Sequence, residues 1–322
     1  MLVVDLASPL ALLDSDLLEE LLRDKRSPNT RRTYAKGLKD FFVAMTQADP
    51  SPERIAWFLG LGRFEAIALV LRYRAGLLER GLTPATVNVR LAAVKSLVNY
   101  ARKVGRCDYS LEDVDGLWVE TYRDTRGVTP DGFKQMAAQV NVETLKRKRD
   151  IAILRLLWDN ALRRAEVCSL NIEDYQPGEA TLLIKGKGKL TKEPITLSSK
   201  AIYLISEWLG VIGEPLRGGE ASRLPDSPLF CTVDRATFGH RLSGNAIYNI
   251  VRDSAKAAGI EKVMSPHRVR HSAITAALDA TNGDTRKVQK LSRHKNLNTL
   301  MIYDDNRHQH QAEVTGILAD LI

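Results

Sequence analysis

The chain has 322 residues, of which 44% are hydrophobic and 27% are charged, as is usual for a globular protein with buried cores. Its formal net charge of +8 favours a polyanionic partner, of which nucleic acid is the simplest. The length suggests two domains of ordinary size. No apolar run approaches the roughly 18 residues of a membrane helix, and the mildly apolar start lacks the basic segment of a signal peptide.

The first third of the chain predicts four or five helices with basic polar faces. Apolar residues recur at helical spacing over residues 11–24, 34–45, 54–80 and 83–104, with an uncertain break near residue 61. Five basic residues crowd the start of the second helix: Lys25, Arg26, Arg31, Arg32 and Lys36. A solvated surface would explain such a cluster, but its single sign also suits contact with phosphates.

Residues 105–128 are polar, contain several glycines and lack the helical pattern of apolar residues, so we place an interdomain linker there, ending near Thr129-Pro130. Beyond it the pattern predicts helices over residues 130–140, 145–161 and 244–258, a β-hairpin over 178–198, a surface loop over 213–227 and a short C-terminal helix. The expected fold class is therefore mainly α with a small β-sheet (α+β).

The three cysteines are far apart and form no C-x-x-C pair, so neither a zinc site nor a disulfide framework is indicated: Cys107, Cys168 and Cys231. Unpaired cysteines fit a reducing compartment, and we expect a cytoplasmic protein. The GKGK stretch at residues 186–189 is no phosphate-binding loop, because the spacing and the following helix of that motif are missing.

The stretch from Pro266 to Tyr303 concentrates the chemistry. His267 and Arg270 are three residues apart and share one face of a helix that Ser265-Pro266 would begin. A helix start carries free N–H groups and the positive end of a dipole, which suit an anion. With His294 and Tyr303, two imidazoles, a guanidinium and a phenol could converge on a phosphate. Tyrosine can also act as a covalent nucleophile.

Three sequence boxes resemble those of the tyrosine recombinases, the phage-integrase family. HRVRHSAIT resembles the H-x-L-R-H-[ST]-x-A-T box, and LSRHKNLNTLMIY resembles L-G-H-x-x-[IL]-x-T-T-x-x-Y, with the same step from histidine to tyrosine. NALRRAEVCSLNIEDY resembles T-G-L-R-x-x-E-[LV]-x-x-L-x-x-x-D, which places Arg163, Glu166, Leu170 and Asp174 in the box. Ala161 replaces a customary glycine, and Ser292-Arg293 replaces a customary Leu-Gly.

The predicted hairpin resembles the family's G-K-G-x-K-x-R-x-x-P segment, whose lysine reaches the cleaved strand. Lys187 matches through the Gly-Lys-Gly triplet. The step to Pro194 is one residue short and the expected arginine is missing, so Lys185 or Lys189 could be the equivalent lysine instead.

The resemblance implies six catalytic residues: Arg163, Lys187, His267, Arg270, His294 and Tyr303. The two arginines would bracket the oxygens of a scissile phosphodiester while the tyrosine attacks phosphorus, giving a 3′-phosphotyrosine and a free 5′-hydroxyl. His267 would help deprotonate the phenol or hydrogen-bond the phosphate, and His294 would donate to a phosphate oxygen. The lysine would protonate the departing oxygen. No cofactor and no metal is required.

The same resemblance implies a helical core-binding (SAM-like) domain over residues 1–110, a linker over 111–128 and a catalytic domain over 129–322 with a C-terminal exchange helix. DNA contacts would come from seven basic residues: Arg26, Arg31, Arg32, Lys36, Arg90, Lys95 and Arg268.

The function implied is that of a site-specific recombinase that cleaves and rejoins double-stranded DNA at an inverted-repeat site. It would work through a Holliday junction in a synaptic tetramer, at the nucleoid and away from membranes. Two alternatives stay open: a type IB-like topoisomerase, and a non-catalytic DNA-binding protein of the same fold.

Overall fold

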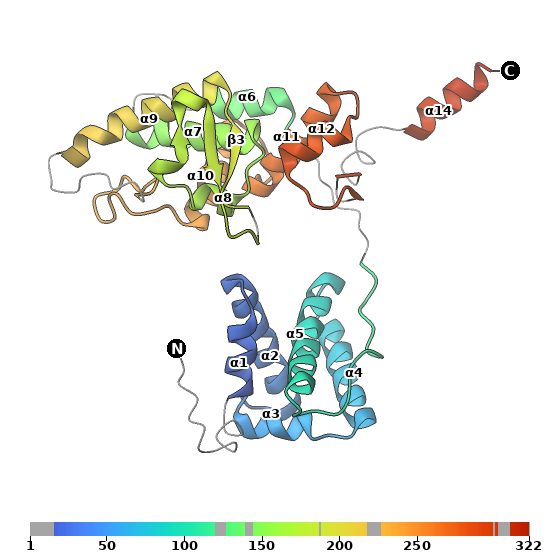
Figure 1. Ribbon diagram of the computed structural model, residues 1–322. Coiled ribbons are helices and arrows are strands. Elements are labelled where there is room, and N and C mark those ends of the chain that lie inside the picture. The colour runs from blue at the N-terminus through green and yellow to red at the C-terminus, as the bar shows by residue number, and fades with distance from the viewer. Residues whose placement is uncertain are drawn as a thin grey trace. The chain divides into compact units, whose positions relative to one another are not determined.

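The computed structural model describes residues 16–119, 127–138, 144–186, 188–217, 227–298, 300–301 and 310–321 (Figure 1). The chain divides into two compact units, Met1–Arg123 and Asp124–Ile322. The fold is mainly helical with one small sheet, as the sequence predicts. No helix among the described residues is long and apolar enough to cross a membrane.

The first unit consists of five described helices: α1 (Leu17–Asp24), α2 (Pro28–Thr46), α3 (Pro52–Leu59), α4 (Arg63–Glu79) and α5 (Pro84–Lys103). Helices α2, α3 and α5 each begin with proline after a serine or threonine whose side chain accepts a backbone N–H, a strong local start signal. Residues 54–80, where the sequence predicts helix with an uncertain break near residue 61, form two helices separated at residues 60–62.

Helices α2 and α5 pack together at the centre of the first unit. A methyl group added to Gly37 of α2 would lie 2.8 Å from the Cβ of Ala93 on α5, so only glycine allows this close approach. Phe41 packs edge-on against Phe58 and Tyr73, with ring centroids 4.9 and 5.1 Å away. The two helices that carry most of the predicted DNA contacts are thereby held rigidly against each other.

The segment after α5, where the sequence places the linker, continues to pack on the first unit. Leu111 and Val114 are buried in its core. The Asn88 side chain of α5 both donates to the Leu117 carbonyl and accepts the Leu117 N–H, at 2.8 and 2.7 Å. The two units are therefore connected by a chain that is ordered on α5 up to at least residue 117.

The second unit is built on α7 (Leu145–Asp159), which packs against α9 (Ser199–Arg217) and α11 (Pro266–Ala280). The other described helices are α6 (Pro130–Ala138), α8 (Arg164–Cys168), α10 (Gly244–Ala257), α12 (Thr285–Ser292) and α14 (His310–Ala319). Residues 213–217, predicted as part of a loop, form the last turn of α9. The buried Ile205, Trp208 and Ile212 of α9 lie at helical spacing up to this last turn.

The predicted hairpin is confirmed as two strands, β2 (Thr181–Ile184) and β3 (Glu193–Thr196), with Thr181 opposite Thr196. The short strand β1 (Tyr175–Gln176) pairs with β2 on its other edge, so the antiparallel order is β1-β2-β3. Leu182 and Ile184 of β2 face the core, which fixes the register of the hairpin.

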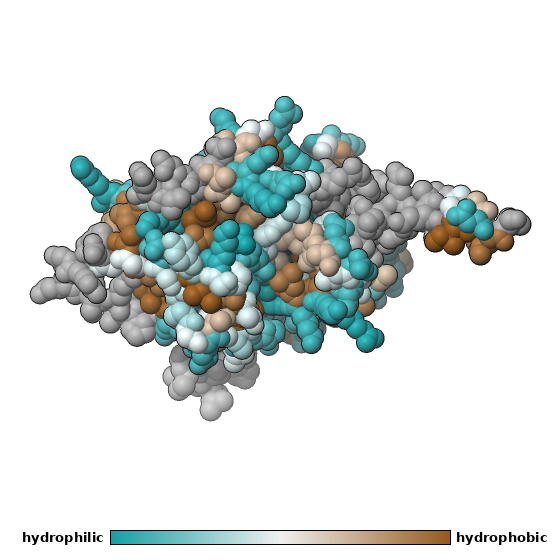
Figure 2. All heavy atoms as spheres, turned by 90° about the horizontal axis from the view of Figure 1, so that it is seen from above, coloured by the Kyte–Doolittle hydropathy of each residue, from teal (hydrophilic) through white to brown (hydrophobic). Residues whose placement is uncertain are grey.

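A separate apolar cluster joins the end of α7 to α11 and α12, which lie side by side (Figure 1). It contains Ala161, Ile274, Leu278, Val288 and Leu300. The helix ends that carry the predicted site residues are therefore fixed by their own small core. By contrast, the described side chains of α14 are exposed, and apolar ones gather along it (Figure 2).

Candidate active site

Arg163 stands where the chain leaves α7 and enters α8. Ala161 ends α7 in the left-handed region with φ of 45°, the conformation for which the family uses glycine. Arg163 directly precedes α8, and the Glu166 carboxylate accepts both its backbone N–H and its Nη1, each at 2.8 Å. Glu166 thus orients an arginine.

Glu166 is a buried carboxylate, 2% exposed, with a second guanidinium beside it. Arg293 Nη2 donates to Glu166 Oε2 at 3.1 Å. Burial alone would raise the pKa of Glu166. The backbone N–H of Arg163 and the charges of Arg293 and Arg163 outweigh that burial, and the net pKa is lowered. Glu166 is therefore ionised at neutral pH and serves as a fixed anchor for arginines.

Arg270 comes from the first turns of α11, which Ser265 caps and Pro266 begins, as predicted. It is 2% exposed, and its guanidinium donates to the backbone carbonyls of Ala161 and Ser292. Its Nη2 also lies 3.4 Å from His294 Nε2. Because these carbonyls end α7 and α12, one buried guanidinium ties the ends of both helices together.

His267 lies one turn before Arg270, but its side chain is more exposed. Its Nε2 lies 2.8 Å from Nε2 of the buried His271, one turn further along α11. One of the two rings must donate and the other accept, so the pair shares a proton in this geometry. His271 was not predicted as a site residue, although its spacing of four residues from His267 places the two rings on one face of the helix.

His294 follows α12, where Gln289 Nε2 donates to its carbonyl at 3.0 Å. Burial is the main reason that the pKa of the His294 imidazole falls to about 4. The positive charges of Arg270, Arg163 and Arg293 lower it further, and His267 adds a smaller electrostatic contribution. The three boxes of the sequence therefore meet here: Arg270 Nη2 lies 3.4 Å from His294 Nε2, and Arg163 and Arg293 share the Glu166 carboxylate.

A hollow of about 490 Å³ opens beside this point. Its lining includes Arg163, Glu166, Arg293 and His294, together with Gly186, Lys189, Glu193, Gln289, Lys290 and Lys295. Cations outnumber carboxylates in this lining, which suits an anionic ligand. No group of side chains that could hold a metal ion is found among the described residues.

Two of the six predicted catalytic residues, Lys187 and Tyr303, lie outside the described residues. The alternative hairpin lysine Lys189 lines the hollow and is ion-paired with Glu193, whereas Lys185 is exposed at the end of β2. The other four residues, Arg163, His267, Arg270 and His294, are brought together.

Of the residues predicted to contact DNA, Arg26, Arg31, Arg32 and Lys36 lie exposed at or near the start of α2, and Arg90 and Lys95 are partly buried on α5. Arg31 also donates to the Lys25 carbonyl at 2.6 Å. Arg268 of α11 donates to the Val263 carbonyl at 2.6 Å. These are surface positions on three helices, and their role on DNA stays a prediction.

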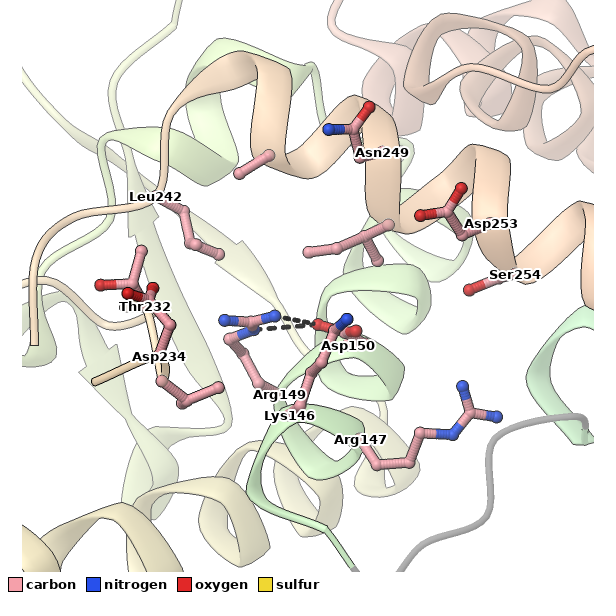
Figure 3. Close-up of a pocket in the computed structure, with 13 residues that line it drawn as sticks. Lys146, Arg147, Arg149, Asp150, Thr232, Asp234, Leu242, Asn249, Asp253 and Ser254 are labelled. Atoms are coloured by element: carbon pink, nitrogen blue, oxygen red, sulfur yellow. Dashed lines mark hydrogen bonds and ion pairs between the residues drawn. The ribbon is translucent and has the colours of Figure 1, made fainter. Parts of the chain in front are cut away.

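A second hollow in the same unit, of about 580 Å³, is lined by a different ion pair (Figure 3). Arg149 donates from Nε and Nη2 to Asp150 Oδ1, at 2.9 and 2.7 Å, and from Nη1 to the Cys231 carbonyl. Asp234 and Asp253 also line it. None of the four described residues that were predicted to be catalytic lies in its lining.

Comparisons with known proteins agree with this geometry. The profile of the phage integrase family matches residues 127–310. A tyrosine recombinase of Synechocystis sp. is 71% identical over 310 residues, which cover 96% of each chain. A tyrosine recombinase XerC of Thermodesulfovibrio yellowstonii is 28% identical over 291 residues, 89% of each chain.

Solved structures share the fold at lower identity. XerH site-specific recombinase bound to a palindromic difH substrate has a TM-score of 0.65 at 22% identity, covering 94% of this chain and 84% of that one. A lambda integrase tetramer bound to a Holliday junction has a TM-score of 0.61 at 15% identity, covering 94% and 82%.

The chain therefore belongs to the phage integrase family. Within that family it is a tyrosine recombinase, an enzyme of site-specific recombination that cleaves and rejoins DNA. The alternatives left open by the sequence, a topoisomerase or a non-catalytic DNA-binding protein, are not favoured by the recombinase names of these relatives.

Proposed function

We propose that Tyr303 is the nucleophile and that the hollow between α8 and α12 receives the scissile phosphate. The phenolic oxygen forms a bond to phosphorus, and the bond to the 5′-oxygen breaks, which leaves a 3′-phosphotyrosine and a free 5′-hydroxyl. The reverse attack by a 5′-hydroxyl rejoins the strand. The observation that supports this best is that Arg163 and His294 both line this hollow, with Arg270 Nη2 3.4 Å from His294 Nε2.

Arg163 and Arg270 hold the two non-bridging oxygens and stabilise the charge that gathers on them at the transition state. Their environments differ in a useful way. Arg270 is buried and tied to two backbone carbonyls, so it is preorganised before DNA arrives. Arg163 uses Nη1 to reach Glu166, and its side chain is 29% exposed toward solvent.

The histidines divide the remaining work. His294 is uncharged at neutral pH in the free enzyme, so it acts as a neutral donor or takes up a proton once the phosphate offsets the arginines. His267 accepts the phenolic proton or bonds to the phosphate, and its pairing with His271 provides a route by which that proton is shared.

A lysine of the β2–β3 hairpin protonates the departing 5′-oxygen. We propose Lys187 from its place in the Gly-Lys-Gly triplet. Lys189 is the alternative, because its ammonium group lines the hollow and needs only to leave Glu193 to become available. Lys185 is the third possibility. Replacing each lysine by alanine, with a 5′-bridging phosphorothioate substrate that needs no proton, distinguishes them: only loss of the general acid is rescued by that substrate.

The partner proposed is double-stranded DNA with an inverted-repeat recombination site, bound by the basic faces of α2 and α5 and by Arg268. Four copies would assemble on two such sites and exchange strands through a Holliday junction, with the exposed apolar strip of α14 docked on a neighbouring copy. The enzyme would work on DNA at the nucleoid, in the cytoplasm.

The test uses a library of random-sequence nicked duplexes, in which the released strand diffuses away and the covalent complex accumulates. We expect wild-type protein to become linked to DNA and Tyr303→Phe to bind DNA equally but form no linkage. Sequencing the trapped DNA gives the site and shows whether it is an inverted repeat. Covalent DNA trapped by Tyr303→Phe at the wild-type level would overturn the assignment.

A further inference from the structure

Arg293 occupies a backbone conformation that disfavours it. It ends α12 in the left-handed region with φ of 56°, at the place where the family customarily has glycine. A non-glycine residue there costs on the order of 1 kcal/mol. Such a cost is sustained when the side chain makes compensating contacts, and the described contacts of Arg293 are unusually many.

The guanidinium of Arg293 reaches from α12 to the end of α7. Nη1 donates to the carbonyls of Leu291 and Asn160, at 2.8 and 3.0 Å, and Nη2 donates to the carbonyl of Ala161 at 3.2 Å. The side chain is only 16% exposed. A cation over the last carbonyls of a helix is favourable, because these groups lack partners in the helix and carry the negative end of its dipole.

The same Nη2 also donates to Glu166 Oε2 at 3.1 Å, the oxygen that accepts the Arg163 backbone N–H. The other oxygen, Oε1, accepts Arg163 Nη1. Among the described contacts, the Arg163 guanidinium therefore donates one hydrogen bond to this carboxylate, from Nη1. Two parallel bonds between one guanidinium and both carboxylate oxygens would be the stronger arrangement, and it does not form here.

We infer that Arg293 is a positioning residue. It occupies one oxygen of Glu166 and thereby limits the Arg163 guanidinium to one hydrogen bond with this carboxylate. The other N–H donors of Arg163 are then available to the DNA phosphate. Without Arg293, the described bond left on Oε2 is the one from the Arg163 backbone N–H, and this oxygen can then accept a second bond from the Arg163 guanidinium. The resulting bidentate pair would consume the donors and the charge that the phosphate needs. This inference rests on the proposed function, because it gives Arg163 a phosphate to bind.

The direct test is Arg293→Asn, because asparagine tolerates the left-handed backbone and removes the guanidinium. We expect the single-turnover rate of covalent linkage, at saturating protein, to fall about 10- to 100-fold. Affinity for the nicked duplex should change less than about twofold. Arg286→Asn makes the same substitution at an exposed position of the same helix, and its linkage rate should equal that of the wild type.

A double-mutant cycle separates positioning through Glu166 from a general structural effect. In a Glu166→Gln background the carboxylate can no longer form a charged fork with Arg163, so Arg293→Asn should then slow linkage less than about threefold. An equal fold-loss in both backgrounds, or a wild-type rate for Arg293→Asn alone, would overturn the inference. Wild-type and Tyr303→Phe proteins run alongside: if the wild type forms no covalent complex, the proposed function fails, and not this inference alone.

Discussion

Two buried carboxylates of the second unit, Glu166 and Asp150, lie beside arginines, yet their pKa values are shifted in opposite directions. Glu166 is 2% exposed and Asp150 is 5% exposed, so burial penalises both charges. The pKa of Glu166 is nevertheless lowered, because Arg163 and Arg293 both bond to it. The pKa of Asp150 is raised, because burial outweighs the charge and hydrogen bonds of Arg149. Two further basic side chains also lie near Asp150, so the number of nearby cations does not decide the outcome. The hydrogen bonds differ instead: Glu166 accepts the Arg163 backbone N–H and a bond from each of two guanidinium groups, whereas the described bonds to Asp150 come from Arg149.

The surroundings of Glu166 suit the binding of an anion, whereas the Arg149–Asp150 ion pair belongs to the packing of the fold. Around Glu166 the arginines outnumber the carboxylate, and the excess positive charge lines an open hollow. The hollow beside Asp150 is lined by three basic side chains and three carboxylates, so charge is balanced there (Figure 3). Both hollows are similar in size, and volume alone would not tell them apart.

The largest effect on stability is expected at the Arg149–Asp150 ion pair. Arg149→Met leaves Asp150 buried without its partner, and we expect the unfolding free energy to fall by about 3–5 kcal/mol. Arg149→Met with Asp150→Leu should recover most of this loss. Urea unfolding measures both. Below its melting transition, Arg149→Met should link DNA at the wild-type rate. A slow rate in the folded variant would instead place this pair in the active site.

Arg163→Ala should show the converse pattern. Loss of one donor to the phosphate is expected to slow covalent linkage about 100- to 1,000-fold. Arg293 still pairs with Glu166, and Arg163 is partly exposed, so most of the stability should remain. Single-turnover linkage and urea unfolding on the same preparation give both values. Large loss of stability with little loss of rate would make Arg163 a structural residue like Arg149.

His294 offers a smaller effect that depends on pH. Its folded pKa of about 4 lies below the ordinary value of 6.5, so the unfolded chain takes up the proton first as pH falls. Stability from the neutral ring is complete above pH 6.5 and is lost from there toward pH 4. With allowance for partial exposure, we expect a loss of about 1 kcal/mol between pH 6.5 and pH 5. His294→Gln should lack this component in urea unfolding at the two pH values, and an unchanged pH dependence would refute it.

Much of this arrangement is predictable from sequence because it depends on local signals. Ser265-Pro266 and Thr83-Pro84 mark helix starts, and the boxes around Arg163, Arg270 and His294 indicate which helix ends must meet. The share of Glu166 held by Arg293 is not predictable in this way. It depends on contacts of the Arg293 side chain with the end of α7 and with Glu166. These residues are far apart in the sequence, and the periodicity of apolar residues does not indicate which of them meet. The last turn of α9 was likewise not predicted, whereas the break at residues 60–62 was indicated by Gly60 and Gly62 in the sequence.

The smallest effect concerns the backbone that these arginines hold. Ala161 keeps φ of 45°, and its carbonyl accepts hydrogen bonds from Arg270 and Arg293. Ala161→Gly removes the left-handed penalty but adds freedom to the unfolded chain, so we expect a net gain of roughly 0.5 kcal/mol in unfolding free energy. The linkage rate should stay within about twofold, because both guanidinium groups still fix the carbonyl. A large fall in rate would mean that strain at Ala161, and not its two donors, sets the position of Arg163. Gly at this position would then stabilise the fold while loosening the site.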